Sequence, residues 1–151
     1  MKYWLIKSEP NVYSIDDLKK DKKTHWDGVR NYQARNFLRD EMKIGDKVVF
    51  YHSNTEPPGA AGICEVTKEG YPDFTAFDPD DKHYDPKSKK DSPTWIMVDV
   101  KFVEKFRNVV SLETIKENKK LQNMKLVQRG NRLSVMPVTK TEFDEIVKMG
   151  K

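Results

Sequence analysis

Hydrophobic positions along the chain follow two spacings, the alternation typical of β-strands and the three-to-four-residue spacing typical of helices. Aromatic and branched residues dominate 3–8, which ends at a Glu-Pro pair and therefore predicts a strand stopped by the proline. Residues 47–53 are almost continuously apolar, as expected of a strand buried on both faces. Further strands are predicted at 61–66, 95–106 and 132–138.

Helices are predicted where a capping residue precedes hydrophobic residues at the three-to-four-residue spacing. Ser14 with Asp17, and Thr139 with Glu142, have the spacing of a capping box. Asn31 is suited to cap a helix that places Ala34, Leu38 and Met42 on one face. A further short helix is predicted at 111–118, and 73–93 is predicted to be a long irregular surface loop.

About five strands with short helices between them, and no repeating strand-helix-strand order, predict an α+β fold. We expect a mixed sheet that curls toward a barrel, with helices packed outside it. The length of 151 residues suits one domain, so residues 1–151 are expected to form a single domain.

Composition supports a folded chain outside the secretory route. Charged residues make up 34% of the chain, yet 3 Trp, 6 Tyr and 7 Phe provide the bulky groups that disordered chains lack. No apolar run is long enough for a membrane span, and Lys2 and Lys7 interrupt the start where a signal peptide is apolar. The single cysteine, Cys64, excludes an intramolecular disulfide. We therefore expect no membrane partner and a cytoplasmic location, or a nuclear one in a eukaryote.

Positive charge is concentrated in one stretch. The whole chain has a formal net charge of +4, whereas 101–132 holds nine basic and three acidic residues. Such a stretch suits a polyanionic partner, but solvated helix and loop faces explain it equally well.

The motifs of common enzyme classes are missing. The sequence has no phosphate-binding glycine loop and no nucleophile elbow. His25, His52 and His83 are far apart, without the spacing of a metal site, and Cys64 lies within a predicted strand as a buried thiol. We expect a protein that is not an enzyme and needs no metal or other cofactor.

One dense run, 26–36, combines the side chains that bind an unpaired nucleobase. Such recognition needs flat aromatic faces, amides for the polar edge of the base, and cations for the flanking phosphates. The run supplies the aromatic residues Trp26 and Tyr32, the amides Asn31 and Gln33, and the cations Arg30 and Arg35. The alternative is that the aromatic residues are core and the amides only cap a helix.

Two strand ends are candidates to join this run. Residues 7–10 and 51–54 each change from apolar to polar where a strand meets its loop, the usual place for a site. If the two strands pair in parallel, both ends lie on one rim.

Four ordered motifs resemble those of the EVE domain family. They are YWLIKSEP at 3–10, WDGVRNYQARN at 26–36, FYHSN at 50–54 and QRGNRLSV at 128–135. The resemblance covers essentially the whole chain. It implies a PUA-like pseudobarrel of about five or six strands, related to the YTH readers of methylated adenine in RNA.

The resemblance also implies a function. EVE domains are expected to bind a modified nucleobase, proposed to be a modified cytosine in DNA, flipped into an aromatic-lined pocket. Carried over to this chain, it places Trp26 and Tyr32 around the base, Ser8, Asn31, Gln33, Ser53 and Asn54 on its polar edge, and Lys7, Arg30 and His52 near the base or backbone. Arg35 and Arg129 are the candidate phosphate contacts.

Three other functions remain open at this point. The first is an RNA-binding module that reads a modified base, which the likeness to YTH domains permits. The second is a small-molecule or nucleotide enzyme that uses the same pocket, with His52 as acid or base. The third is an adaptor whose aromatic patch binds another protein. A monomer is the default in each case.

Overall fold

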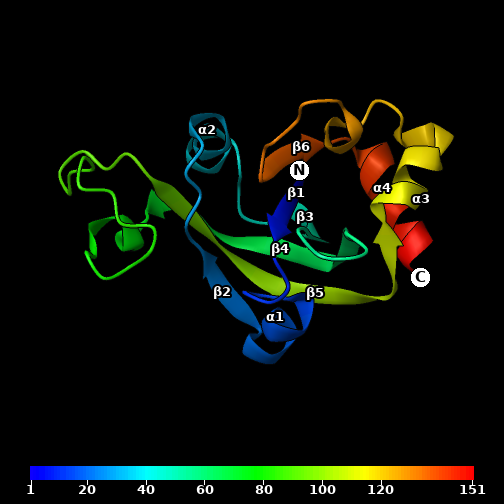
Figure 1. The fold of residues 1–151 in the computed structure, drawn as a ribbon, viewed down its shortest axis with the longest axis horizontal. Helices are drawn as coiled ribbons and strands as arrows, with labels where there is room; N and C mark the ends of the chain where they lie inside the picture. The colour runs from blue at the N-terminus through cyan, green and yellow to red at the C-terminus, as the bar shows by residue number, and fades with distance from the viewer.

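A computed structural model describes all residues, 1–151, and its centre is a six-stranded mixed sheet (Figure 1). The strands are β1 (Tyr3–Ser8), β2 (Lys23–Trp26), β3 (Lys47–His52), β4 (Gly59–Pro72), β5 (Ile96–Ser111) and β6 (Val135–Val138). The helices are α1 (Ile15–Asp21), α2 (Tyr32–Asp40), α3 (Leu112–Glu117) and α4 (Lys140–Gly150), with short 3-10 turns η1 (Phe74–Phe77), η2 (Lys119–Leu121) and η3 (Lys125–Val127). No helix is both long and apolar enough to cross a membrane.

The strands lie in the order β2-β5-β4-β3-β1-β6. β1 and β3 pair in parallel, and every other neighbouring pair is antiparallel. The predicted α+β class with a mixed PUA-like sheet is therefore confirmed, and the sheet stays open between its edge strands β2 and β6.

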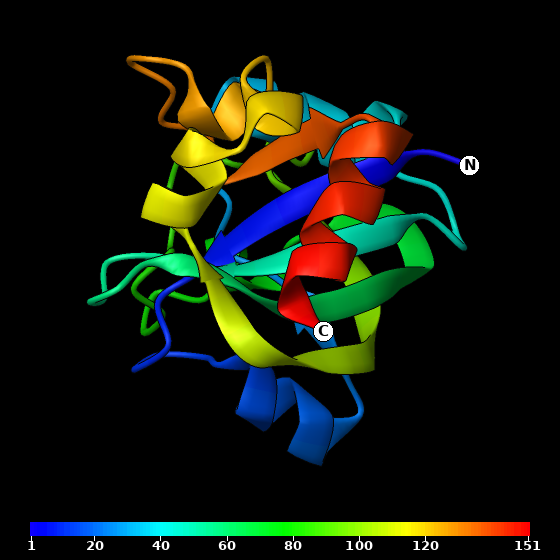
Figure 2. The ribbon, with the colours of Figure 1, turned by 90° about the vertical axis from the view of Figure 1, so that its right-hand side faces the viewer.

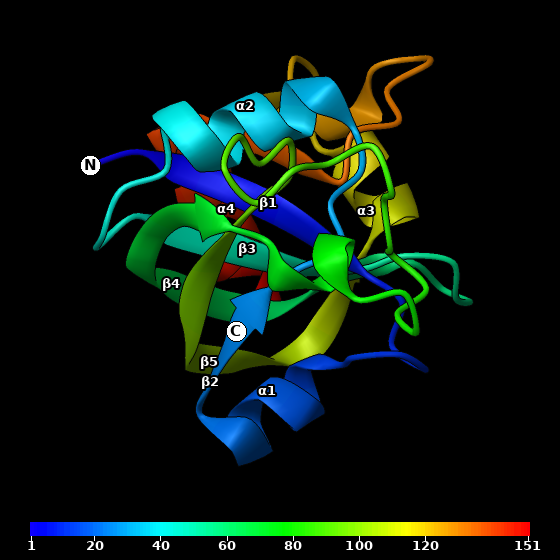
Figure 3. The same cartoon turned by 90° about the vertical axis from the view of Figure 1, so that its left-hand side faces the viewer.

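Alternation along the central strands divides the core between the two faces of the sheet. In β1, Trp4 and Ile6 join one cluster of 18 buried residues, while Leu5 joins another of 15. Helices α1 and α2 cover the first cluster, and α3 and α4 cover the second. Figure 2 shows α3 and α4 on one flank, and Figure 3 shows α1 and α2 from the opposite side with the loop between β4 and β5 in front.

Both predicted capping boxes are present. The hydroxyl of Ser14 accepts from the N–H of Asp17, and the hydroxyl of Thr139 accepts from the N–H of Glu142. In turn, the side chain of each acidic residue accepts from the N–H of the capping residue. Asn31 caps α2 by accepting from the N–H of Ala34. These short-range bonds explain why the starts of α1, α2 and α4 are readable from sequence.

The structure corrects the predicted strands at four places. Residues 23–26, where no strand is predicted from sequence, form strand β2, an edge strand that pairs only with β5. β4 and β5 are longer than predicted because register shifts between them absorb polar residues without ending the pairing. β6 is shorter, since its pairing with β1 begins only at Val135.

Candidate functional site

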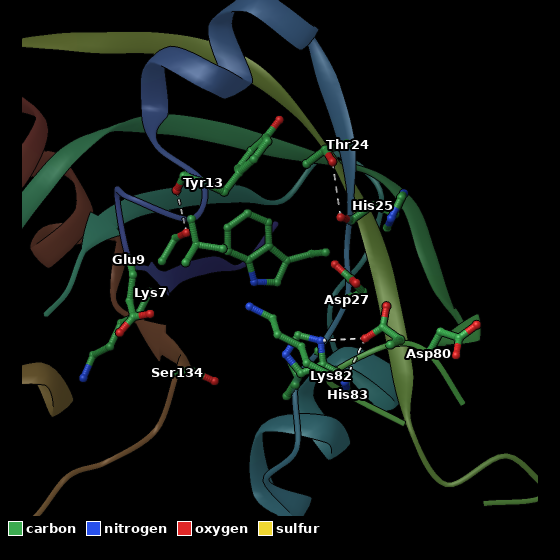
Figure 4. Close-up of a pocket in the computed structure, with 16 residues that line it drawn as sticks. Lys7, Glu9, Tyr13, Thr24, His25, Asp27, Asp80, Lys82, His83 and Ser134 are labelled. Atoms are coloured by element: carbon green, nitrogen blue, oxygen red, sulfur yellow. Dashed lines mark hydrogen bonds and ion pairs between the residues drawn. The ribbon is translucent and has the colours of Figure 1, made fainter. Parts of the chain in front are cut away.

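The largest hollow is a pocket of about 740 Å³ at the carboxyl ends of β1 and β2 (Figure 4). Five segments far apart in the sequence form it: the end of β1, the chain leading into α1, β2 with the turn after it, the loop between η1 and β5, and the residue before β6. The lining residues are Lys7, Ser8, Glu9, Val12, Tyr13, Thr24, His25, Trp26, Asp27, Gly28, Val29, Asp80, Asp81, Lys82, His83 and Ser134.

Trp26 is the aromatic residue between this pocket and the core. It ends β2 and is only 9% exposed, with its ring edge-on to Phe50 at 5.4 Å and to Tyr13 at 6.3 Å between centroids. No protein group accepts from its indole N–H, and no buried side-chain nitrogen or oxygen atom of the protein lacks a partner. The N–H is therefore accessible, and Trp26 can offer a ligand both a hydrogen bond and an aromatic surface.

The parallel pairing of β1 and β3 brings the two predicted strand ends to one rim. Ser8 lies opposite His52 in register, and the N–H of Ser53 donates to the carbonyl oxygen of Ser8 at 2.9 Å. Only the β1 side of this rim reaches the pocket lining, through Lys7, Ser8 and Glu9. Asn54, with a positive φ of 53°, instead donates from its amide to Glu9 at 2.5 Å.

Two of the rim side chains make bonds within the protein. The Ser8 hydroxyl donates to the carbonyl oxygen of Tyr13 at 2.6 Å, and Nε2 of His52 accepts from the N–H of Ile15 at 3.1 Å. Both bonds fix the chain between β1 and α1, which forms one wall of the pocket. Burial lowers the pKa of His52; Asp16 opposes this shift and Lys105 adds to it.

This arrangement predicts a pH dependence of stability that depends on His52. Protonation would remove the acceptor that Ile15 uses, so the unfolded chain, with an ordinary histidine pKa near about 6.5, binds the proton more readily than the folded chain. We expect stability to be full above that pH and to fall as the pH drops through the lower folded-state pKa. His52→Gln keeps an acceptor but cannot titrate, so its urea midpoint should fall less than that of the wild type between about pH 7 and 5.

The matched control is His25→Gln, because His25 is exposed on β2 and makes no side-chain hydrogen bond in the protein. In this variant the urea midpoint should fall with decreasing pH as steeply as in the wild type. If the urea midpoints of the wild type and of His52→Gln fell equally with pH, the role assigned to His52 would be contradicted.

Arg30 does not line the pocket but holds its far wall in place. Its guanidinium donates to Asp73 at 3.0 Å, to the Thr75 hydroxyl at 3.2 Å and twice to the carbonyl oxygen of His83, at 2.7 and 3.1 Å. Asp73, which is fully buried, also accepts from the N–H of Gly28 at 2.8 Å. Arg30 and Asp73 thus link the turn that follows β2 to the loop that carries His83.

Two further observations describe this junction. Burial alone would raise the pKa of Asp73, but hydrogen bonds from Thr75, Gly28 and Arg30 outweigh burial and hold it below its ordinary value. Gly28 has a φ of +81°, and a Cβ there would lie 2.6 Å from the His83 ring, so no larger residue fits without moving the wall.

Charges of both signs face the pocket. Lys7 and Lys82 form no ion pair, and burial lowers the pKa of Lys7. Figure 4 shows Lys82 extending toward the middle of the pocket and the Asp27 carboxylate on the β2 side. The pocket therefore offers a polar ligand both donors and acceptors beside its aromatic floor.

Asn31, Gln33 and Arg129 line a second hollow, of about 440 Å³, rather than the pocket. Its other residues are Lys125, Gln128, Gly130, Asn131, Arg132 and Leu133. Lys125, Arg129 and Arg132 are exposed and form no ion pair. Ser134 lines the pocket and its neighbour Leu133 lines the hollow, so the two sites are adjacent.

The structure separates the remaining predicted residues from both hollows. Tyr32 is 61% exposed and stacks on Trp95 with 5.0 Å between ring centroids. Arg35 lies 5.1 Å from the Tyr32 ring and donates to the carbonyl oxygen of Thr94 at 2.9 Å. These two side chains form a cation-aromatic surface on α2.

Several pocket residues were not predicted from sequence. Asp27 lies inside the run 26–36 without a role assigned to it, and Asp80, Lys82 and His83 belong to the loop read as irregular surface. The only sequence signal for that loop was its length, since long loops in small domains are often functional. No group of three or more His, Cys, Asp or Glu side chains is arranged to hold a metal ion.

Comparisons with known proteins agree with the sequence motifs. The family model of the EVE domain matches residues 2–149. Human thymocyte nuclear protein 1 is 46% identical over 166 aligned positions, covering 97% of this chain and 73% of that protein. A Pseudomonas syringae protein of known structure is 48% identical, with a TM-score of 0.95 over 99% of both chains. The crystal structure of the human THYN1 protein in complex with 5-methylcytosine-containing DNA is 45% identical, with a TM-score of 0.92 over 100% of this chain and 98% of that one.

Proposed function

Because this chain belongs to the EVE domain family, we propose that it is a DNA-binding module that recognises a modified cytosine, flipped out of the double helix into the Trp26 pocket. We further propose that residues 1–151 act as one EVE domain. The human relative solved with 5-methylcytosine-containing DNA supports the choice of DNA and of cytosine. The observation that carries the proposal is the pocket itself, with an aromatic floor and a volume within the roughly 300–1,000 Å³ of ligand sites.

The chemistry of the pocket supports binding over catalysis. The Ser8 hydroxyl is committed to a backbone carbonyl, and Cys64 is buried in β4, with a pKa raised by burial. His52, the acid or base of the enzyme hypothesis, lies outside the pocket and bonds to Ile15. We therefore favour a non-enzymatic reader.

Phosphate contacts are assigned to the second hollow. Lys125, Arg129 and Arg132 are free cations beside the amides Asn31 and Gln33, next to the pocket. Cations that replace counterions give affinity that depends on salt but not on sequence. A flipped base in the pocket would thus be flanked by a backbone held in the hollow. For the location we propose the nucleus in a eukaryote, as the name of the human relative suggests, and the cytoplasm otherwise.

The test compares matched oligonucleotides, DNA and RNA, that carry a single cytosine or 5-methylcytosine, at about 0.05 and 0.2 M salt. We expect tighter binding of the methylated DNA, a ratio that persists at both salt concentrations, and absolute affinities that fall with salt. Equal binding of the two bases at both concentrations would overturn base reading, and tighter binding of RNA would favour the RNA alternative.

Variants in the hollow separate phosphate contacts from base reading in the same assay. Arg129→Ala with Arg132→Ala should weaken both oligonucleotides alike and lower the salt slope by about 2, because each phosphate contact contributes about 1. Lys116→Ala with Lys119→Ala removes equal charge from exposed positions outside the hollow, and should change the slope less.

A further inference from the structure

Methylation alone does not distinguish a modified cytosine from thymine. 5-Methylcytosine and thymine carry the same methyl group on the same ring, and both stack on an aromatic face equally well. They differ at the ring nitrogen of position 3, which accepts in cytosine and donates in thymine, and at position 4, where cytosine has an amine that donates and thymine has a carbonyl oxygen that accepts. A reader of modified cytosine therefore needs a group that faces this position.

Asp27 is the pocket carboxylate that is free to do so. No protein group donates to its oxygens, and it forms no ion pair. The other inward carboxylates are occupied, since Glu9 accepts from Asn54 and Asp81 accepts from the N–H of His83. Asp80 is exposed, and Figure 4 shows it pointing outward from the pocket.

The backbone on both sides of Asp27 is held. Trp26, before it, is paired with Val98 of β5, and the N–H of Gly28, after it, donates to buried Asp73. Because the backbone on both sides is held, only the side-chain torsions of Asp27 have to be ordered when the ligand binds.

We propose that Asp27 accepts a hydrogen bond from the exocyclic amine of the bound cytosine and that this contact excludes thymine; the inference rests on the proposed function. An ionised carboxylate only accepts, so it matches the amine of cytosine and opposes the oxygen of thymine. Lys82, which extends into the pocket from the other side, supplies a donor for the carbonyl oxygen at position 2.

The test uses duplex DNA in which 5-methylcytosine, cytosine or thymine lies opposite an abasic site, so that none of the three is paired beforehand. The wild type should bind 5-methylcytosine at least about fivefold more tightly than thymine. Asp27→Asn presents an amide that donates or accepts, so this ratio should fall toward one while the ratio of 5-methylcytosine to cytosine stays above one. Asp91→Asn makes the same charge change at an exposed position outside the pocket and should keep the wild-type ratio.

The outcomes separate the two proposals. If the wild type binds 5-methylcytosine and cytosine equally, the proposed function fails. If it prefers 5-methylcytosine to cytosine but binds thymine as tightly, or if Asp27→Asn keeps the preference over thymine, the assignment of Asp27 is overturned and the proposed function stands.

Discussion

Asp73→Ala is expected to lower the free energy of unfolding by about 3–5 kcal/mol, because it leaves the guanidinium of Arg30 without its counterion in a mostly buried setting. The variant also removes the acceptor for the N–H of Gly28 and for both donors of Thr75. Since these bonds join the turn after β2 to the loop that carries His83, we expect discrimination between 5-methylcytosine and cytosine to be lost as well. The effect on binding should thus exceed what partial unfolding explains.

Urea denaturation measures the free energy of unfolding. Fluorescence anisotropy of labelled oligonucleotides, corrected for the fraction of protein that remains folded, measures the discrimination between 5-methylcytosine and cytosine. Asp91→Ala removes the same charge from an exposed position, so it should change stability by no more than about 0.5 kcal/mol and leave base selectivity intact. A loss below about 1 kcal/mol for Asp73→Ala would mean that the Arg30–Asp73 pair contributes little. Unchanged selectivity would show that the wall of the pocket does not depend on it.

The parts of the fold that were predictable from sequence depend on neighbours in the chain. Ser14 and Asp17 meet within one turn of helix, and Asn31 reaches Ala34 in the same way, so their spacing alone identifies the start of each helix. The continuous apolar run of β3 predicted a strand buried on both faces. The prediction holds because β3 lies in the middle of the sheet, between β1 and β4. Both signals are local or follow directly from a central place in the sheet.

The parts that were missed depend on partners distant in the sequence. β2 is a short edge strand with three of its four residues polar, and only its pairing with β5 makes it a strand. The far wall of the pocket rests on the bonds from Arg30 to Asp73 and to His83, across 43 and 53 residues. No local sequence pattern indicates such contacts, so Lys82 and His83 could not be assigned to the site from the sequence.

Helix geometry explains why the run 26–36 does not form one site. Successive residues of an α-helix differ by about 100° in direction, since a turn takes 3.6 residues. At the start of α2, Tyr32 therefore stacks on Trp95 while the next residue, Gln33, lines the second hollow together with Asn31, the extended residue that caps the helix. The six candidate residues of this run are divided among the pocket, the hollow, an exposed surface and, for Arg30, the bonds behind the pocket wall. Whether each contacts nucleic acid stays a prediction.

Trp26→Ala is expected to have the largest effect on base binding. Base–aromatic stacking contributes about 1–3 kcal/mol, so affinity for the methylated oligonucleotide should fall by about 5- to 150-fold and selectivity should disappear. The same change removes a large side chain that is 9% exposed and packs on Phe50, which costs about 3–5 kcal/mol of stability. A loss of binding by this variant alone is therefore ambiguous.

Phe50→Ala resolves the ambiguity because it matches the loss of packing without touching the pocket. Phe50 is fully buried, packs against Trp26 and does not line the pocket, so this variant should lose about as much stability yet keep the preference for 5-methylcytosine in its folded fraction. Trp26→Phe keeps an aromatic face but lacks the indole N–H, and its affinity should lie between those of the wild type and Trp26→Ala. If Trp26→Ala, corrected for its folded fraction, still prefers the methylated base, Trp26 lies outside the base site and the pocket has another ligand.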